Sequence, residues 1–171
     1  MAQGAGVAAD GGGAGAVFRG VTQLALDAKG RLAIPAKHRD ALAGRADAAD
    51  ANGTGTVVLT ADPSRCLLVY PRAAWEPIQA RLMALSSFNE QIRGLQRLIV
   101  GHADDVDIDA NGRILVPPAL RQYASLDHHV VLVGQGNKFE LWDEARWQEQ
   151  TTRAITFPAG GLPPELDGFS L

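Results

Sequence analysis

The sequence predicts an α+β fold, rich in β-strands, built from two tandem copies of one unit. The first observation is a repeated motif: Asp-Ala-Lys-Gly-Arg at 27–31 recurs as Asp-Ala-Asn-Gly-Arg at 109–113, 82 residues later. The second is the setting of each motif, which lies between short apolar segments that end in a Pro. This order is typical of strand, tight turn, strand and helix. The third is that 46% of the 171 residues are hydrophobic, enough for a folded core.

Each motif predicts a tight turn of defined chemistry. Gly30 and Gly112 would supply the positive φ that a hairpin turn requires. The aspartates at the turn starts, Asp27 and Asp109, can accept hydrogen bonds from backbone N–H groups of the turn. We therefore assign a turn-shaping role to the two glycines and the two aspartates.

The first repeat is expected over residues 17–72, after a Gly/Ala-rich extension over 1–16 that lacks the apolar surface to fold. Pro35 is placed to open a helix and Gly44 to end it. The remaining expected elements are strands at 24–26, 32–34, 57–59 and 66–70, with a polar loop at 46–56.

A helical linker is expected over 73–101, between the two repeats. Ser87 to Glu90 fits a capping box, and Gly101 would end the helix that follows it. The second repeat is expected over 102–146, with a hairpin formed by 130–133 and 138–142. The segment 147–171 would hold a C-terminal helix capped by Asp143 and a loosely held tail from Pro158.

Charge is distributed unevenly along the chain. The whole chain has a net charge of −3, which gives no global attraction to nucleic acid. Residues 17–45 nevertheless carry +4, whereas 46–171 carry −6. A basic first repeat on an acidic body suits an oriented contact with DNA, although a solvated charged face would give the same pattern.

The candidate DNA-binding residues lie in the two turns: Lys29 and Arg31 in the first, Asn111 and Arg113 in the second. Arginine can donate two hydrogen bonds to O6 and N7 of guanine, and lysine can contact phosphate or guanine. The competing interpretation is that Arg31 pairs with Asp27 and merely shapes the turn. The residues alone leave these two interpretations open.

Several long segments resemble the MraZ family, which is encoded at the head of bacterial division and cell-wall gene clusters. They include both Asp-x-x-Gly-Arg turns together with Phe18–Gly20, Leu67–Pro71, Leu85–Ser87, Leu95–Arg97, Val131–Gly136, Phe139–Glu144 and the closing Ser170-Leu171. The resemblance covers the chain from Val17 onward; residues 1–16 depart from it.

The resemblance implies a fold and a function. The fold would be two AbrB-like β-barrel halves of the swapped-hairpin type, forming one pseudo-symmetric unit. The function would be a transcriptional repressor that binds promoter direct repeats in double-stranded DNA as a ring-like homo-oligomer. Such a protein would be cytoplasmic and nucleoid-associated and would use no cofactor.

Other function classes have weaker support. Residues 107–112 fit the first half of a calcium-binding EF-hand loop, but the twelfth position is Pro118 where a bidentate Glu is required. We therefore expect no metal site. We also expect no catalytic residues, no small-molecule substrate and no membrane segment. Two alternatives stay open: a structural or antitoxin-like oligomeric interaction module, and, more weakly, an enzyme using the acidic cluster 104–109.

Overall fold

The two repeats build the same series of elements in the same order. The structure is a computed structural model that describes residues 17–44, 55–156, 161 and 163–169. The expected extension at 1–16, most of the expected loop at 46–56 and part of the expected tail lie outside these residues. The first series is β1 (Val21–Ala25), β2 (Arg31–Ala33), α1 (Ala36–Ala43), β3 (Thr56–Ala61), β4 (Leu67–Pro71) and α2 (Arg72–Met83). The second series is β5 (Asp104–Asp107), β6 (Arg113–Leu115), α4 (Pro118–Tyr123), β7 (His129–Gly134), β8 (Phe139–Asp143) and α5 (Glu144–Ile155).

The strands confirm an α+β fold and exchange partners between the repeats. Six antiparallel strands form one sheet in the order β1-β7-β8-β4-β3-β5. This order is symmetric, because strands at the same distance from the two edges of the sheet are equivalent strands of the two repeats. The pairings β1–β7, β3–β5 and β4–β8 each join one repeat to the other. A two-stranded ribbon, β2–β6, does the same. Because the strands on either side of a motif join different sheets, neither repeat closes a sheet alone.

The core is shared in the same way. Leu32, Ile34, Ile114 and Val116, at equivalent positions after the two turns, are all fully buried. They belong to one apolar cluster that draws residues from both repeats. Burial of each aliphatic side chain of this size stabilises the fold by about 1.5–3 kcal/mol. These four side chains therefore hold the segments after both turns against the body of the molecule.

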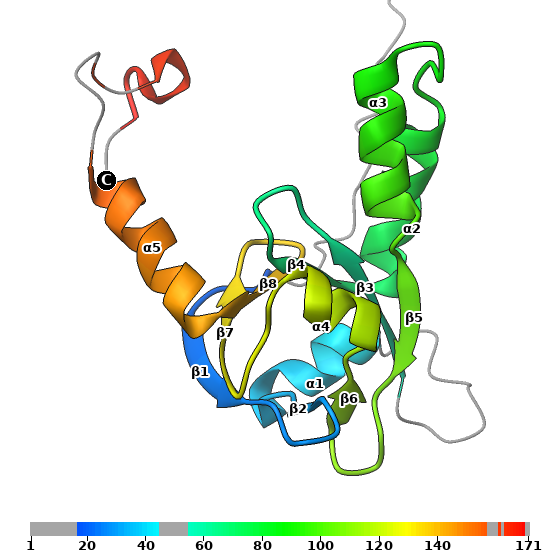
Figure 1. Cartoon of the computed structure of the whole chain (residues 1–171), viewed down its shortest axis with the longest axis vertical. Coiled ribbons are helices and arrows are strands. Elements are labelled where there is room, and N and C mark those ends of the chain that lie inside the picture. Colours follow the sequence, from blue (N-terminus) through cyan, green and yellow to red (C-terminus); the bar gives the residue numbers. More distant parts are fainter. Residues whose placement is uncertain (1–16, 45–54, 157–160, 162, 170–171) are drawn as a thin grey trace, which may run out of the picture.

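Between the repeats, α2 and α3 (Glu90–Leu95) form a projecting helical arm (Figure 1). The expected capping box is wrong: Asn89 caps α3, and its side chain accepts hydrogen bonds from the N–H groups of Gln91 and Ile92. Asn89 directly precedes the helix, whereas Ser87 lies too early to reach those groups. A short π-helix (Gln96–Val100) follows and is held to the sheet by the Thr60 hydroxyl, which donates to the Ile99 carbonyl.

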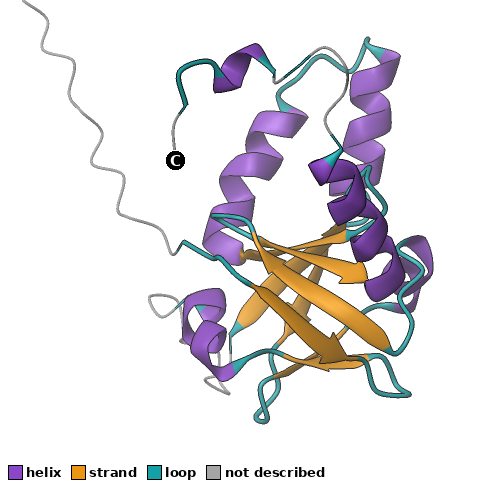
Figure 2. Cartoon of the chain, turned by 90° about the vertical axis from the view of Figure 1, so that its left-hand side faces the viewer, coloured by secondary structure: helices purple, strands orange, loops and turns teal. Residues whose placement is uncertain are grey.

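The projecting helices and the motif turns lie at opposite ends of the molecule. Figure 1 shows α2, α3 and α5 extending toward the top, and the β1–β2 and β5–β6 loops at the bottom. Figure 2, a view turned by 90°, shows the same separation across the sheet. None of the helices among the described residues has the length and apolar character needed to cross a membrane.

Candidate nucleic-acid interface

The first motif turn is closed by one carboxylate. Asp27 Oδ1 accepts hydrogen bonds from the backbone N–H groups of Lys29 and Arg31, each at 2.9 Å. Asp27 Oδ2 accepts one from Nε of Arg31 at 2.6 Å. Gly30 has a φ of +82°, and its N–H donates to the Asp27 carbonyl at 2.9 Å. These contacts close the turn around Asp27 and Gly30, the two residues of this turn to which we assigned a turn-shaping role.

The second turn repeats this arrangement. Asp109 Oδ1 accepts from the N–H groups of Asn111 and Arg113 at 2.9 Å, and Oδ2 accepts from Nε of Arg113 at 3.0 Å. Gly112 has a φ of +75°. Both Asp109 oxygens thus face the turn, which leaves the carboxylate poorly placed for the EF-hand role considered from the sequence. Among the described residues, no group of three or more His, Cys, Asp or Glu side chains is arranged to hold a metal ion.

The same contacts lower the pKa of both aspartates. The backbone N–H of Arg31, followed by its guanidinium and the Lys29 N–H, lowers the pKa of Asp27 from 3.8 to about 2. The equivalent groups of Arg113 and Asn111 lower the pKa of Asp109. Both turns therefore hold a charged carboxylate whose negative charge is compensated by an adjacent arginine.

The β2–β6 ribbon joins the two turns. Its register places Arg31 opposite Leu115 and Ala33 opposite Arg113. Leu32 and Ile114, between them, point into the core. Since strand side chains alternate, the two arginines, Ala33 and Leu115 share the outer face of the ribbon. Leu115 is 51% exposed there, and the two arginine side chains are each 33% exposed.

The other two candidates, Lys29 and Asn111, occupy the exposed tip of each turn. They are equivalent positions, so the first turn carries a positive charge where the second carries an amide. The second turn also follows β5, an edge strand on which Asp104, Asp105 and Asp107 are exposed. The two ends of the ribbon are thus alike in backbone geometry and different in electrostatic setting.

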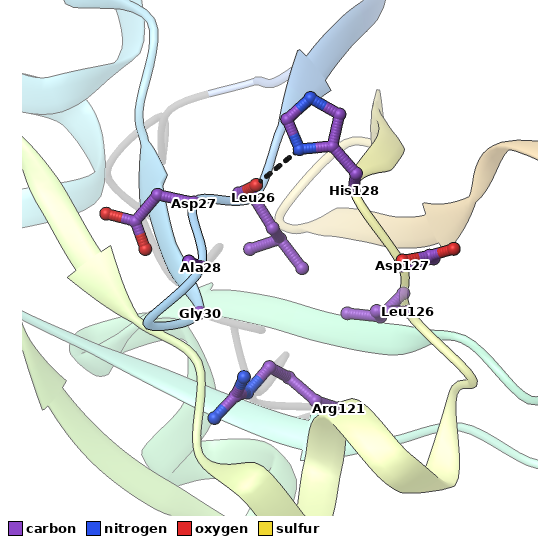
Figure 3. A pocket seen from close by; sticks show the side chains of 8 residues that line it. All are labelled: Leu26, Asp27, Ala28, Gly30, Arg121, Leu126, Asp127 and His128. Atoms are coloured by element: carbon purple, nitrogen blue, oxygen red, sulfur yellow. Dashed lines mark hydrogen bonds between the residues drawn. The ribbon is translucent and has the colours of Figure 1, made fainter.

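Two further arginines contact the turns, and the sequence reasoning gave them no role. Arg121, on α4, donates from Nε to the Val116 carbonyl at 3.1 Å and lies against Gly30 (Figure 3). Arg39, on α1, donates from Nε to the Ile34 carbonyl at 2.8 Å and lies against Gly112. Each arginine follows its own motif arginine by eight residues, so the two occupy equivalent positions in the two repeats.

Beside the first turn lies a hollow of about 440 Å³. It is lined by Leu26, Asp27, Ala28, Gly30, Arg121, Leu126, Asp127 and His128. Figure 3 shows the Arg121 guanidinium pointing toward Gly30 from below and His128 at the opposite side. His128 contacts the Leu26 carbonyl through Nδ1 at 2.8 Å. The back of the first turn is therefore contacted by residues of the second repeat.

Comparisons with known proteins are consistent with the internal repeat. Residues 17–98 and 99–159 each match the family model described as "MraZ protein, putative antitoxin-like". The protein named Transcriptional regulator MraZ of Nitrosomonas eutropha is 57% identical over 155 residues, which cover 91% of this chain and 100% of that relative. Proteins of the same name from Nitrosomonas europaea and Thiobacillus denitrificans are 56% and 54% identical with the same coverage.

Proposed function

Because the chain belongs to the MraZ family of transcriptional regulators, we propose that it is a sequence-specific DNA-binding repressor that reads promoter direct repeats as a homo-oligomer. The observation that carries the proposal is the pair of matching turns at the two ends of the ribbon. Each presents an arginine whose Nε is fixed by an aspartate, so the guanidinium plane is oriented before DNA arrives.

This arrangement suits recognition of base edges. Guanine offers two acceptors in the major groove, and the two Nη groups of an arginine can meet both. The Asp27 pairing, which competed with DNA readout in the sequence reasoning, supports it here because it uses Nε and holds the fork rigid. The ion pair also compensates the aspartate charge, which would otherwise repel phosphate.

The β2–β6 ribbon has the size that such a contact requires. B-DNA admits a two-stranded β-ribbon in its major groove, which is about 12 Å wide. Arg31 and Arg113 lie at diagonal corners of the outer face. In this proposal Lys29, exposed at the tip of the first turn, contacts phosphate, and Asn111, exposed at the tip of the second, pairs with adenine.

Self-association would supply the affinity that one ribbon lacks. Several copies on one DNA molecule raise the effective concentration of each turn. The helical arm and its surroundings expose apolar side chains that association would cover, among them Met83, Leu85, Phe88 and Leu95. Because the arm lies at the end opposite the turns, assembly through it would leave the turns accessible. Assembly into a ring and a cytoplasmic, nucleoid-associated location are parts of this proposal.

The alternative function is an antitoxin-like or structural interaction module. The exposed arm and the description of the matching family model favour it. In that case the turns would contact protein, and binding to DNA would show no sequence preference.

The test is fluorescence anisotropy with DNA from directly upstream of the gene, compared with a shuffled fragment of equal length, at several salt concentrations. We expect tighter binding to the upstream fragment, a steep loss of affinity with salt and, by native mass spectrometry, several chains per fragment. Equal affinity for the two fragments would contradict the proposal and favour the interaction module.

A further inference from the structure

We propose that Arg39 and Arg121 are positioning residues, each of which holds in place the recognition turn of the other repeat. This inference rests on the proposed function for its consequence in DNA binding. The bracing itself is a property of the free protein and can be tested without DNA.

Arg121 lies directly against the first turn. A Cβ built on Gly30 would lie 2.6 Å from both Nε and Nη1 of Arg121, so the guanidinium occupies the space that a side chain at position 30 would fill. Gly30 is buried although its neighbours Ala28 and Lys29 are exposed. The turn therefore has its open side toward solvent and its back against a group from α4.

Arg121 is itself held by the backbone of Val116. Its Nε donates to the Val116 carbonyl, and the Val116 N–H donates to the Gly30 carbonyl at 2.9 Å. Val116 thus connects the arginine to the turn through its own two backbone groups. All of these donors come from the second repeat, whereas the turn they hold belongs to the first.

The same arrangement holds the second turn, with Arg39 in place of Arg121. The Ile34 N–H donates to the Gly112 carbonyl at 2.9 Å, and the Ile34 carbonyl accepts from Nε of Arg39. A Cβ built on Gly112 would lie 2.7 Å from Cδ of Arg39 and still nearer its guanidinium. The backbone relay, the arginine and the glycine therefore recur at both ends of the ribbon, each time crossing from one repeat to the other.

The consequence is a crossed dependence. The inner side of each turn is closed locally, by Asp27 or Asp109, but its back is set by the opposite repeat. Removal of Arg121 should loosen the turn that carries Arg31, and removal of Arg39 should loosen the turn that carries Arg113. A residue that merely contacted phosphate would loosen neither turn in the free protein.

The primary test is hydrogen–deuterium exchange at short labelling times, read by mass spectrometry on peptides spanning 26–33 and 108–115. The variants are Arg121→Met and Arg39→Met, which keep the apolar stem, with Arg121→Gln as a second replacement. For Arg121→Met we expect exchange at least about threefold faster in the first turn, with the second turn unchanged, and the reverse for Arg39→Met. Uniform loosening, loosening of the variant's own turn, or no change would overturn the proposal.

A lysine replacement separates bracing from charge. Arg121→Lys keeps the positive charge but lacks the planar Nε–H donor that Val116 accepts. We expect Arg121→Lys to exchange like Arg121→Met. Wild-type exchange in Arg121→Lys would show that charge alone suffices and would overturn the proposal.

DNA binding provides the second readout. We expect Arg121→Met to weaken specific binding about tenfold, within the usual range for coupled contacts. When Arg121→Met is combined with Arg31→Ala, it should cause little further loss of affinity, because both changes disable the same turn. When Arg39→Met is combined with Arg31→Ala, affinity should fall further, because the second turn is then disabled as well. Full additivity of Arg121→Met with Arg31→Ala would overturn the crossed assignment. If the wild-type protein binds no DNA specifically, the proposed function fails, and the exchange data still decide the bracing.

Discussion

Arg31 lies directly opposite Leu115 across the β2–β6 ribbon, so a motif arginine of the first repeat shares its surface with a residue of the second. The same register sets Arg113 opposite Ala33. The outer face of the ribbon therefore belongs to neither repeat alone. It forms when both repeats fold together, which links the shared core to the proposed recognition surface.

The two turns should contribute unequally to the salt dependence of DNA binding. Lys29→Gln removes a charge at the exposed tip of the first turn, so the slope of log affinity against log salt should fall by about one per contacting chain. Asn111→Ala, at the equivalent tip of the second turn, is the matched control and should leave the slope unchanged. Anisotropy titrations at four or more salt concentrations give both slopes. Equal slopes for the two variants would contradict the asymmetry.

Gly30→Ala should lower the free energy of unfolding by more than the backbone strain alone. Gly30→Ala and Gly136→Ala both place a Cβ at positive φ, which costs about 1–2 kcal/mol. Position 136 has open space, whereas the new Cβ at 30 must displace Arg121 from its hydrogen bond. Urea unfolding should therefore show a further loss of about 0.5–1.5 kcal/mol for Gly30→Ala. In an Arg121→Met background this excess should disappear; its persistence would argue against displacement of Arg121.

The turns should resist moderate acid. The pKa of Asp27 is about 2 in the folded protein and 3.8 ordinarily, so its stabilising contribution is complete above pH 3.8 and is lost as the pH falls through about 2. A titration of the Asp27 carboxyl carbon by NMR should show a midpoint near 2. Arg31→Ala should move the midpoint upward, because it removes the guanidinium while keeping the backbone N–H. A midpoint near 3.8 in the wild-type protein would contradict the described turn.

Much of the fold could be predicted from the sequence because it is local. The positive φ of Gly30 and the Asp27 hydrogen bonds follow from residue chemistry within five positions, and both are present. Short apolar segments between turn residues placed β3, β4, β7 and β8 to within two residues of their ends. Trp75 and Trp142 are buried, as expected of large apolar side chains in a folded core.

The partnerships between repeats could not be predicted in the same way. Nothing local to β1 indicates that it pairs with β7, since sequence periodicity defines the faces of a strand and not its neighbours. For the same reason the residues alone suggested no role for Arg39 or Arg121. The α3 cap was missed because the capping-box pattern that begins at Ser87 placed the start of the helix two residues too early, whereas Asn89 directly precedes the helix.

Spacing of the DNA repeats should matter if several copies bind together. Direct repeats about one helical turn apart, ~10–10.5 base pairs, would present the same face to successive chains. Insertion of five base pairs between two intact repeats should therefore reduce affinity sharply, and insertion of a full turn should restore part of it. Undiminished affinity after the half-turn insertion would rule out coupled binding.

Sequence readout by Arg31 from a fixed turn can be measured as a ratio of two dissociation constants. The ratio of dissociation constants for shuffled and upstream DNA is measured for the wild type, Arg31→Ala and Arg31→Lys, after circular dichroism has verified equal melting. Loss of one arginine contact should cost about 1–3 kcal/mol on the upstream fragment. Arg31→Lys keeps the charge but cannot form the paired contact. We therefore expect the ratio to fall toward one in both variants, while Arg31→Lys retains its affinity for shuffled DNA. An unchanged ratio in Arg31→Lys would contradict base readout by Arg31.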